Sequence, residues 1–354
     1  MVRRLRRSNG PLDLRSQAIL RAVIEEYVTT ATPVGSHALV ERFRLGVSSA
    51  TVRAVLAELE TAGLLMHPHT SAGRVPTESG YRFYVESIVD DLPLPPVEQL
   101  MIRHQFGQVE YASEHWFRLA ATTLASVTRA AGIATPAKPR SAHLRRLDLV
   151  SISERMASLI LVLREGSLKQ VLISLDEVVD QPALTAVANR LNALLDDRTS
   201  GEAEAIVARL DPEDPALALP RRVGERVVRA LQDFDAAAIE ELFSDGLLNV
   251  MAAPEFAQSE KLRRVFAALE NRAFLAQLID SVAGSGSVRV YIGHENPAED
   301  MADVSLILAS YGHPGHAVGV VGVLGPTRMA YPQAIGTVRF VSGLMNELID
   351  HLYA

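Results

Sequence analysis

The chain has 354 residues, of which 48% are hydrophobic, and it contains no cysteine. A chain of this length can bury a large core, and two or three domains are expected. The lack of cysteine excludes disulfide bonds and thiolate metal sites and allows a reducing cytosol. The basic start continues into Ser8-Asn9-Gly10-Pro11 rather than an apolar run, and no stretch approaches membrane-spanning length. We therefore expect a soluble, cytoplasmic protein without a secretory signal.

The formal net charge of −7 is unevenly distributed along the chain. Residues 1–82 contain eleven arginines against seven acidic residues, so the negative excess belongs to the remainder. A basic front on an acidic body is typical of a module that faces DNA and is carried by a domain that does not. The run from Arg3 to Arg7 alone fits a solvated tail better, so the argument depends on the motif that follows.

Two amphipathic helices are expected at the front. Residues 16–30 place apolar side chains at steps of three and four, with charged residues off that seam. Thr32-Pro33-Val34-Gly35 breaks the first helix. Ser36 is expected to cap the second, which has Leu39, Val40 and Phe43 on its apolar face.

A third helix follows the turn at 44–47 and is expected to be capped by Ser48 or Ser49. A helical wheel gives it an apolar side made of Val52, Val55, Leu56 and Leu59. Its opposite side consists of small residues and one cation, namely Ala50, Ala54 and Ala57, flanked by Thr51, Arg53 and Glu58. Such a face suits close approach to a major groove, where Arg53 can pair with guanine or a phosphate. An alanine-rich helix buried on both sides would explain the same pattern.

Two short strand-like pieces come next, Leu64–His67 and Arg74–Pro76, separated by a polar tip that contains Gly73. With the third helix they predict a winged helix-turn-helix, in which the strands form the wing. His67 and His69 have no third ligand nearby, so backbone or phosphate contacts are expected rather than metal binding. Thr77 is expected to cap a further helix.

The body of the chain begins after the proline-rich linker at 90–96. Residues 97–132 are predicted to be helical, and 135–140 is a second break. Strands are predicted at 147–152, 158–163, 170–175, 288–292, 304–308 and 317–324, with helices from about 182 to 275 and from about 334 to 352. This order predicts an α+β domain that is interrupted by a helical insertion, a natural place for self-association.

The body offers no convincing catalytic or metal-binding set, so we expect neither an enzyme nor a cofactor. Gly284-Ser285-Gly286-Ser287 lacks the lysine of a phosphate loop. His313-Pro314-Gly315-His316 is expected to form a turn rather than a zinc site. His294-Glu295-Asn296-Pro297 follows a predicted strand and is expected to form a structural hydrogen-bond network.

The chain resembles the heat-inducible transcription repressor family (HrcA) of bacteria over nearly its whole length. The matching residues at the front are Gln17, Pro33 to Ser36, Ser48 to Arg53, Pro68 to Thr77 and Gly80 to Tyr84. Those in the body are Pro254 to Phe256, Lys261 to Arg263, Ile292 to Asn296 and Gly325 to Met329. The front motif and the last of these motifs are together quite specific.

The resemblance implies an α+β multidomain protein with a winged-helix domain, a GAF-like domain and an inserted dimerisation domain. On this chain we expect the winged helix at 1–90, a helical connector at 91–140, the GAF-like domain at 141–181 and 285–354, and the insertion at 182–284. The resemblance also implies a homodimer that represses chaperone operons at an inverted-repeat DNA operator. It further implies that the chaperonin GroEL assists folding of the repressor, so that unfolded client proteins relieve repression.

The DNA contacts are expected to come from Ser36, His37, Ser48, Ser49, Thr51, Arg53, Ala54, His69, Thr70, Ser71 and Arg74. Arg53 is expected to read a base, while Arg74 and the wing hold the DNA backbone. The family usually has arginine where this chain has His37 and asparagine where it has Ala54. Asparagine can pair with adenine, whereas alanine offers only a methyl contact to thymine, so an altered operator preference is expected.

A ligand-responsive regulator is the alternative that the sequence leaves open. In that reading the GAF-like domain binds a metabolite that switches the affinity for DNA. The apolar residues of the last strands suit either a core or a pocket.

Overall fold

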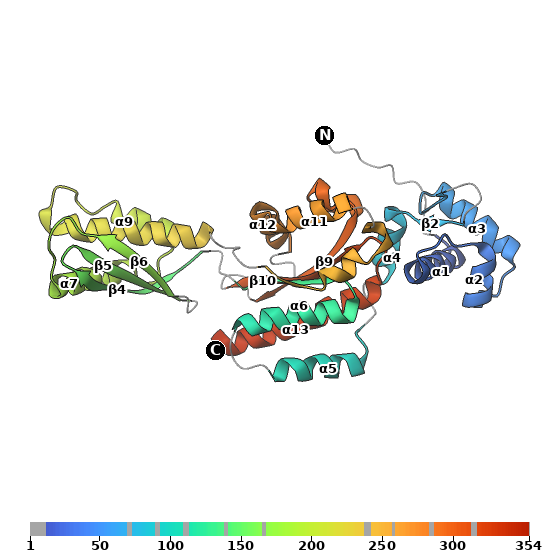
Figure 1. Ribbon diagram of the computed structural model, residues 1–354, viewed down its shortest axis with the longest axis horizontal. Coiled ribbons are helices and arrows are strands. Elements are labelled where there is room, and N and C mark those ends of the chain that lie inside the picture. Colours follow the sequence, from blue (N-terminus) through green and yellow to red (C-terminus); the bar gives the residue numbers. More distant parts are fainter. Residues whose placement is uncertain are drawn as a thin grey trace. The chain divides into compact units, whose positions relative to one another are not determined.

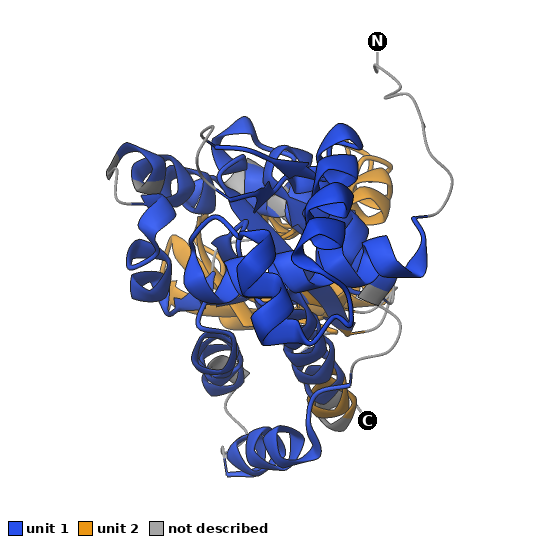
Figure 2. Cartoon of the chain, turned by 90° about the vertical axis from the view of Figure 1, so that its right-hand side faces the viewer, with its two compact units in different colours: residues 1–136, 242–311, 320–345 blue, residues 137–241, 312–319, 346–354 orange. Residues whose placement is uncertain are grey.

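The computed structural model describes residues 12–68, 73–88, 93–108, 113–137, 141–164, 168–236, 242–256, 259–282, 287–312 and 317–353 (Figure 1). The chain divides into two compact units, coloured separately in Figure 2. The first unit comprises Met1–Pro136, Leu242–Tyr311 and Val320–Met345, and the second comprises Ala137–Glu241, Gly312–Gly319 and Asn346–Ala354. Within the described part of the chain, each helix is too short or too polar to cross a membrane.

The N-terminal segment, residues 12–88, contains the helices and short strands that the sequence predicts. Its elements are α1 Leu14–Thr30, α2 Ser36–Phe43, α3 Ser49–Thr61, β1 Leu65–Met66, β2 Val75–Pro76 and α4 Glu78–Ile88. Asp13 caps α1 by accepting a hydrogen bond from the Ser16 amide at 2.7 Å. The predicted cap of α2 is wrong by one residue, because Gly35 occupies the cap position and Ser36 is the first helical residue.

A shared apolar core holds the first three helices together. Its buried side chains include Ile19, Leu20, Val23 and Ile24 of α1, Leu39 of α2, and Val52, Val55, Leu56 and Leu59 of α3. The residues predicted for the apolar side of α3 are therefore the buried ones. The two strands pair antiparallel, with Leu65 opposite Pro76, and Val34 adds a bridge to Arg74.

The rest of the first unit is a five-stranded sheet covered by helices. The strands are β3 Ala131–Ala134, β7 Phe243–Asp245, β8 Arg289–Ile292, β9 Val304–Gly312 and β10 Val318–Pro326, in the order β7-β3-β10-β9-β8. The helices are α5 Pro96–Gly107, α6 Ser113–Thr128, α10 Leu247–Met251, α11 Ser259–Glu270, α12 Arg272–Val282 and α13 Tyr331–Tyr353. Three short 3₁₀ turns complete it, η1 Pro254–Phe256, η2 Gly293–Glu295 and η3 Glu299–Met301.

The sheet is the middle layer of three. Figure 1 shows α11 and α12 on one side of β9 and β10, and α6 and α13 on the other. Residues 304–309 and 320–324 are buried throughout, so both faces of these two strands are covered. The apolar residues of these last two strands, which by sequence suited either a core or a pocket, are therefore buried in a core.

The second unit is a separate α/β layer pair. It contains β4 Leu144–Ser153, β5 Met156–Leu163, β6 Leu168–Ser174, α7 Gln181–Leu195, α8 Ser200–Val207 and α9 Pro215–Ala236. The three strands pair antiparallel in the order β4-β5-β6. Asn192 of α7 joins helix and sheet, because its side chain bonds both the amide and the carbonyl of Leu147 at 2.8 Å.

The structure divides the body differently from the prediction. The prediction placed residues 141–181 in one domain with β8–β10. Strands β4–β6 instead form their own sheet, which packs on α7–α9 in the second unit. Helices α10–α12, assigned to the insertion, cover the five-stranded sheet instead. The other two strands of the sheet are β3 and β7, which lie in the segments predicted to be connector and insertion. The interruption thus runs from about residue 137 to about 241 rather than from 182 to 284.

The packing of α6 on β3 gives a stability prediction. A Cβ at Gly132 would lie 2.0 Å from the carbonyl oxygen of Ala121, so Gly132→Ala must push the helix from the strand. We expect a loss of about 1–3 kcal/mol in the free energy of unfolding. The control is Gly343→Ala in α13, where a Cβ meets open space and alanine should stabilise by about 1 kcal/mol. Urea unfolding followed by circular dichroism measures both, and equal effects of the two variants would contradict the prediction.

Candidate nucleic-acid interface

The outer face of α3 is exposed and carries small side chains around one arginine. Ser48 caps the helix by accepting a hydrogen bond from the Thr51 amide at 3.1 Å, and its hydroxyl lies 2.9 Å from that of Thr51. Arg53 and Ala54 are exposed one turn further along. With the described residues Arg53 forms no salt bridge, so its guanidinium is available to an external acceptor. The first of the two readings of this helix, an outward small-residue face, therefore holds.

The N-termini of α2 and α3 meet at this face. The hydroxyls of Ser36 and Ser49, each the first residue of its helix, lie 3.0 Å apart. Helix N-termini present free backbone amides and a positive partial charge, which favours phosphate groups. His37 is exposed beside them, and its Nδ1 lies 3.4 Å from Glu41. Seven of the eleven residues predicted to contact DNA are thus gathered on two adjoining helix starts.

Arg74 is held inside the segment rather than presented to solvent. Its amide and carbonyl exchange hydrogen bonds with Val34, both at 2.9 Å. Its guanidinium binds Glu60 of α3 at 2.9 Å, and the side chain is only 15% exposed. His67 contacts the other oxygen of Glu60 at 2.8 Å. Arg74 therefore ties the hairpin to α3, and its expected contact with the DNA backbone stays a prediction.

Glu60 is a position that the sequence did not single out, and Gly73 was expected only as part of the polar tip of the wing. A Cβ at Gly73 would lie 2.4 Å from the carbonyl carbon of Val34, so only glycine allows this strand approach. The partners of Glu60 lie seven and fourteen residues away in the sequence. Such separations carry no local signal.

Other predicted positions lie outside the described residues. These are His69, Thr70 and Ser71 of the wing tip, most of the glycine-rich stretch at 284–287, and His313 to His316. Over the described ranges, no group of three or more His, Asp or Glu side chains is arranged to hold a metal ion.

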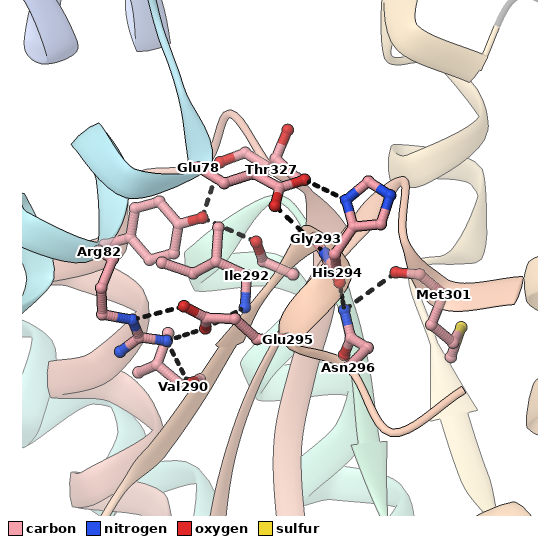
Figure 3. A network of polar contacts seen from close by, with 12 residues as sticks. Glu78, Arg82, Val290, Ile292, Gly293, His294, Glu295, Asn296, Met301 and Thr327 are labelled. Atoms are coloured by element: carbon pink, nitrogen blue, oxygen red, sulfur yellow. Dashed lines mark hydrogen bonds and ion pairs between the residues drawn. The ribbon is translucent and has the colours of Figure 1, made fainter. Parts of the chain in front are cut away.

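The network predicted at His294 to Pro297 is confirmed. The side-chain amide of Asn296 is buried and donates to the carbonyl oxygens of Gly293, Met301 and Val304 at 2.7, 2.9 and 2.8 Å. Figure 3 shows this loop with the side chains of Glu78 and Arg82 from α4 directed at it. That second set of partners was not predicted.

Several known proteins that are similar to this chain carry the same name. Residues 114–335 match the family described as "HrcA protein C terminal domain". A protein of Chloroflexus aurantiacus named heat-inducible transcription repressor HrcA is 42% identical over 356 residues, which cover 98% of this chain and 96% of that protein. One of the same name from Herpetosiphon aurantiacus is 42% identical, covering 97% and 96%, and one from Thermomicrobium roseum is 40% identical, covering 96% and 95%.

A solved structure has a similar fold. It is the crystal structure of a hypothetical protein, with a TM-score of 0.59 at 22% identity, covering 96% of this chain and 98% of that one. At that identity the likeness concerns the fold alone.

The Glu60 cluster gives a prediction of pH dependence. The hydrogen bond with His67, followed by that from Arg74, holds the pKa of Glu60 below its ordinary value of 4.5. A carboxylate with a lowered pKa stabilises the folded state above the unfolded-state value, and this contribution is lost as the pH falls through the folded-state value. We therefore expect Glu60→Gln to lower the melting temperature at neutral pH and to match the wild type in acid.

Melting curves between about pH 7 and pH 3 test this. Glu58→Gln, which removes an exposed carboxylate from the same helix, is the matched control and should show no such convergence. A difference between Glu60→Gln and the wild type that stays constant over the whole range would contradict the assignment.

Proposed function

Since the chain belongs to the HrcA family of heat-inducible transcription repressors, we propose that it binds an inverted-repeat operator as a dimer, through a winged helix-turn-helix formed by α1–α3 and the β1–β2 hairpin. The observation that carries the proposal is the exposed face of α3, with Arg53 unpaired among the described residues and small side chains around it. Small side chains let a helix backbone sit deep in the major groove, where an arginine can contact guanine with two hydrogen bonds.

The two helix starts would position this reading helix on the DNA backbone. Ser36 and Ser49 lie 3.0 Å apart at amide-rich helix ends, which is where a phosphate is favoured. Ser48, Thr51 and His37 lie beside them and can add contacts to phosphates or base edges. Ala54 would offer a methyl group to thymine where the family usually has asparagine. The wing tip with His69, Thr70 and Ser71, and Arg74 behind it, would contact the flanking backbone.

For the body, we propose that the five-stranded sheet with its helices is the GAF-like domain. Taken in chain order, its strands occupy the positions 2-1-5-4-3 across the sheet. The operons under control would be those of the chaperones, and the repressor would act in the cytoplasm, where that DNA lies. Modulation by the chaperonin GroEL rests on the family resemblance, and no contact among the described residues bears on it.

The dimer would form through the second unit. The sheet face turned away from α7–α9 exposes Val150, Ile152, Leu168 and Leu172, at 42, 56, 69 and 63%. Val150, Ser158 and Leu172 form one row across the three strands. An apolar sheet face of this kind is typical of a protein–protein contact, and a two-fold axis makes a single face its own partner.

Arg53 gives the test of DNA reading. Arg53→Ala is expected to reduce the preference for operator over random DNA by about 1–3 kcal/mol per half-site, because a bidentate base contact is lost. Arg53→Lys should keep the binding to random DNA and still lose most of the preference, since lysine has the charge without the fork. Competition gel shifts on the promoters of chaperone operons measure this. Arg190→Ala, an exposed arginine of α7, is the control, and unchanged preference in Arg53→Ala would refute the reading role.

Leu172 gives the test of the dimer. Leu172→Glu places a charge in the proposed contact and is expected to yield monomers by analytical ultracentrifugation, with a loss of affinity for the inverted repeat. Val178→Glu is matched to it, because both side chains are 63% exposed and Val178 lies outside the sheet. A dimer that persists in Leu172→Glu would place the contact elsewhere.

A further inference from the structure

Ion pairs join α4 to the loop after β8 within the first unit. Arg82 Nε donates to Glu295 Oε1 at 2.8 Å, and its Nη2 donates to the Val290 carbonyl at 2.7 Å and to the second oxygen of Glu295. One helical turn earlier, Glu78 contacts Nδ1 of His294 at 2.8 Å. Figure 3 shows the two pairs side by side. We name Glu78, Arg82, His294 and Glu295 the α4 clasp.

The loop that contacts α4 has hydrogen bonds of its own that hold it in place. Gly293 has a φ of 55°, a left-handed conformation that favours glycine, and a Cβ there would lie 2.1 Å from Oε1 of Glu78, so a side chain would displace the Glu78 carboxylate. Glu295 also accepts a hydrogen bond from the Ile292 amide at 3.0 Å, which holds its carboxylate in place. The three bonds of Asn296 to backbone carbonyls stiffen the same loop. A stiff receptor loop transmits orientation rather than merely attaching the helix.

A second tie lies at the end of α1. Arg328 donates to Glu255 at 2.6 Å and to the carbonyl oxygen of Val28 at 2.7 Å, and its side chain is only 15% exposed. Between the two ties, the rings of Tyr81 and Tyr331 are 5.6 Å apart and both residues are buried. The N-terminal segment is therefore held at two separate helices, which restricts rotation as well as translation.

The groups around the clasp favour the charged forms of its residues, which are the forms that make the ion pairs. The hydrogen bond with Glu78 raises the pKa of His294, which favours the imidazolium at this contact. The other carboxylate that acts on His294 is Asp303, and it is already paired with Lys261 at 2.7 Å and Arg264 at 3.7 Å. Arg82 and Glu295 are 28 and 36% exposed, so the pair is partly shielded from solvent and salt.

We propose that the α4 clasp is a positioning element that fixes the direction of α2 and α3 and thereby selects the spacing between the two halves of the operator. This inference rests on the proposed function. In a dimeric repressor each reading helix must meet its half-site on the correct side of the duplex, which turns once in about 10 base pairs. When the N-terminal segment is held in one direction, the second half-site is bound at high effective concentration only if the operator spacing matches the distance between the two segments of the dimer. When the N-terminal segment is loosely held, the dimer tolerates several spacings and gains less binding affinity from each.

The test uses the full chain with Glu78→Gln and Arg82→Gln combined, which removes both ion pairs. Glutamine keeps the side-chain length of Glu78, and at position 82 it is shorter than arginine. Fluorescence anisotropy is measured on a single half-site, on the inverted repeat that the wild type protects in footprinting, and on repeats whose spacer is longer by two or five base pairs. We expect half-site affinity to stay within about twofold of wild type, while the preference for the native spacing falls about tenfold. Arg82→Lys with Glu78 intact should restore most of that preference.

The control is Arg263→Gln, which removes an exposed pair with Glu260 at 3.9 Å in the same unit and should leave the spacing profile unchanged. The proposal is overturned if the double variant keeps the wild-type spacing profile. It is equally overturned if the variant loses half-site binding, because the clasp then supports the fold of the segment rather than its direction. A wild-type protein with no preference for an inverted repeat would instead refute the proposed function itself.

Discussion

Arg74 is the residue on which the N-terminal segment depends, because three pieces of chain meet there. Its backbone pairs with Val34, which directly precedes α2, and its side chain binds Glu60 near the end of α3. Gly73 allows the close strand approach that this pairing needs. The start of α2, the end of α3 and the base of the hairpin are thus fixed relative to one another. These contacts hold the C-terminal half of α3 through Glu60, which lies two turns beyond Arg53 on the same side of the helix.

This use of arginine changes the meaning of the charge pattern. The basic front of the sequence suggested a broad attraction to DNA, yet Arg42, Arg74 and Arg82 each bind a carboxylate, those of Glu26, Glu60 and Glu295. Arginines committed to internal pairs add little to phosphate attraction, because their charge is already neutralised nearby. In the proposed complex the affinity for DNA would rely on the arginines that remain, with Arg53 on the exposed face of α3. Glu26 and Glu60 are already among the seven acidic residues of 1–82, so only the pair with Glu295 lowers the net positive charge of the front further.

Local sequence patterns predicted the elements of the N-terminal segment well. The domain boundaries of the body were predicted wrongly, because they depend on strand pairing between distant segments. The period of the apolar residues in α1 and α3, and the cap at Ser48, are properties of adjacent residues and were readable. Strand β3 is four residues of alanine, glycine and isoleucine directly after a helix, and β7 is three residues long, so neither has a strand signature of its own. Both become strands only because they pair in one sheet. The Glu60 and Glu295 contacts were hidden for the same reason, since their partners are distant in sequence.

The small side chains on the exposed face of α3 give a reason for the α4 clasp. Ala54 and its small neighbours offer a single N-terminal segment few hydrogen-bonding groups with which to distinguish one base from another. In the proposed dimer, discrimination would come from two half-sites bound together, which requires a defined angle between the N-terminal segment and the five-stranded sheet. Glu295 and Glu255 belong to the acidic body, and they receive Arg82 and the arginine that holds α1. Part of the opposition between basic front and acidic body is therefore charge complementarity within the chain, and in our proposal it orients the N-terminal segment.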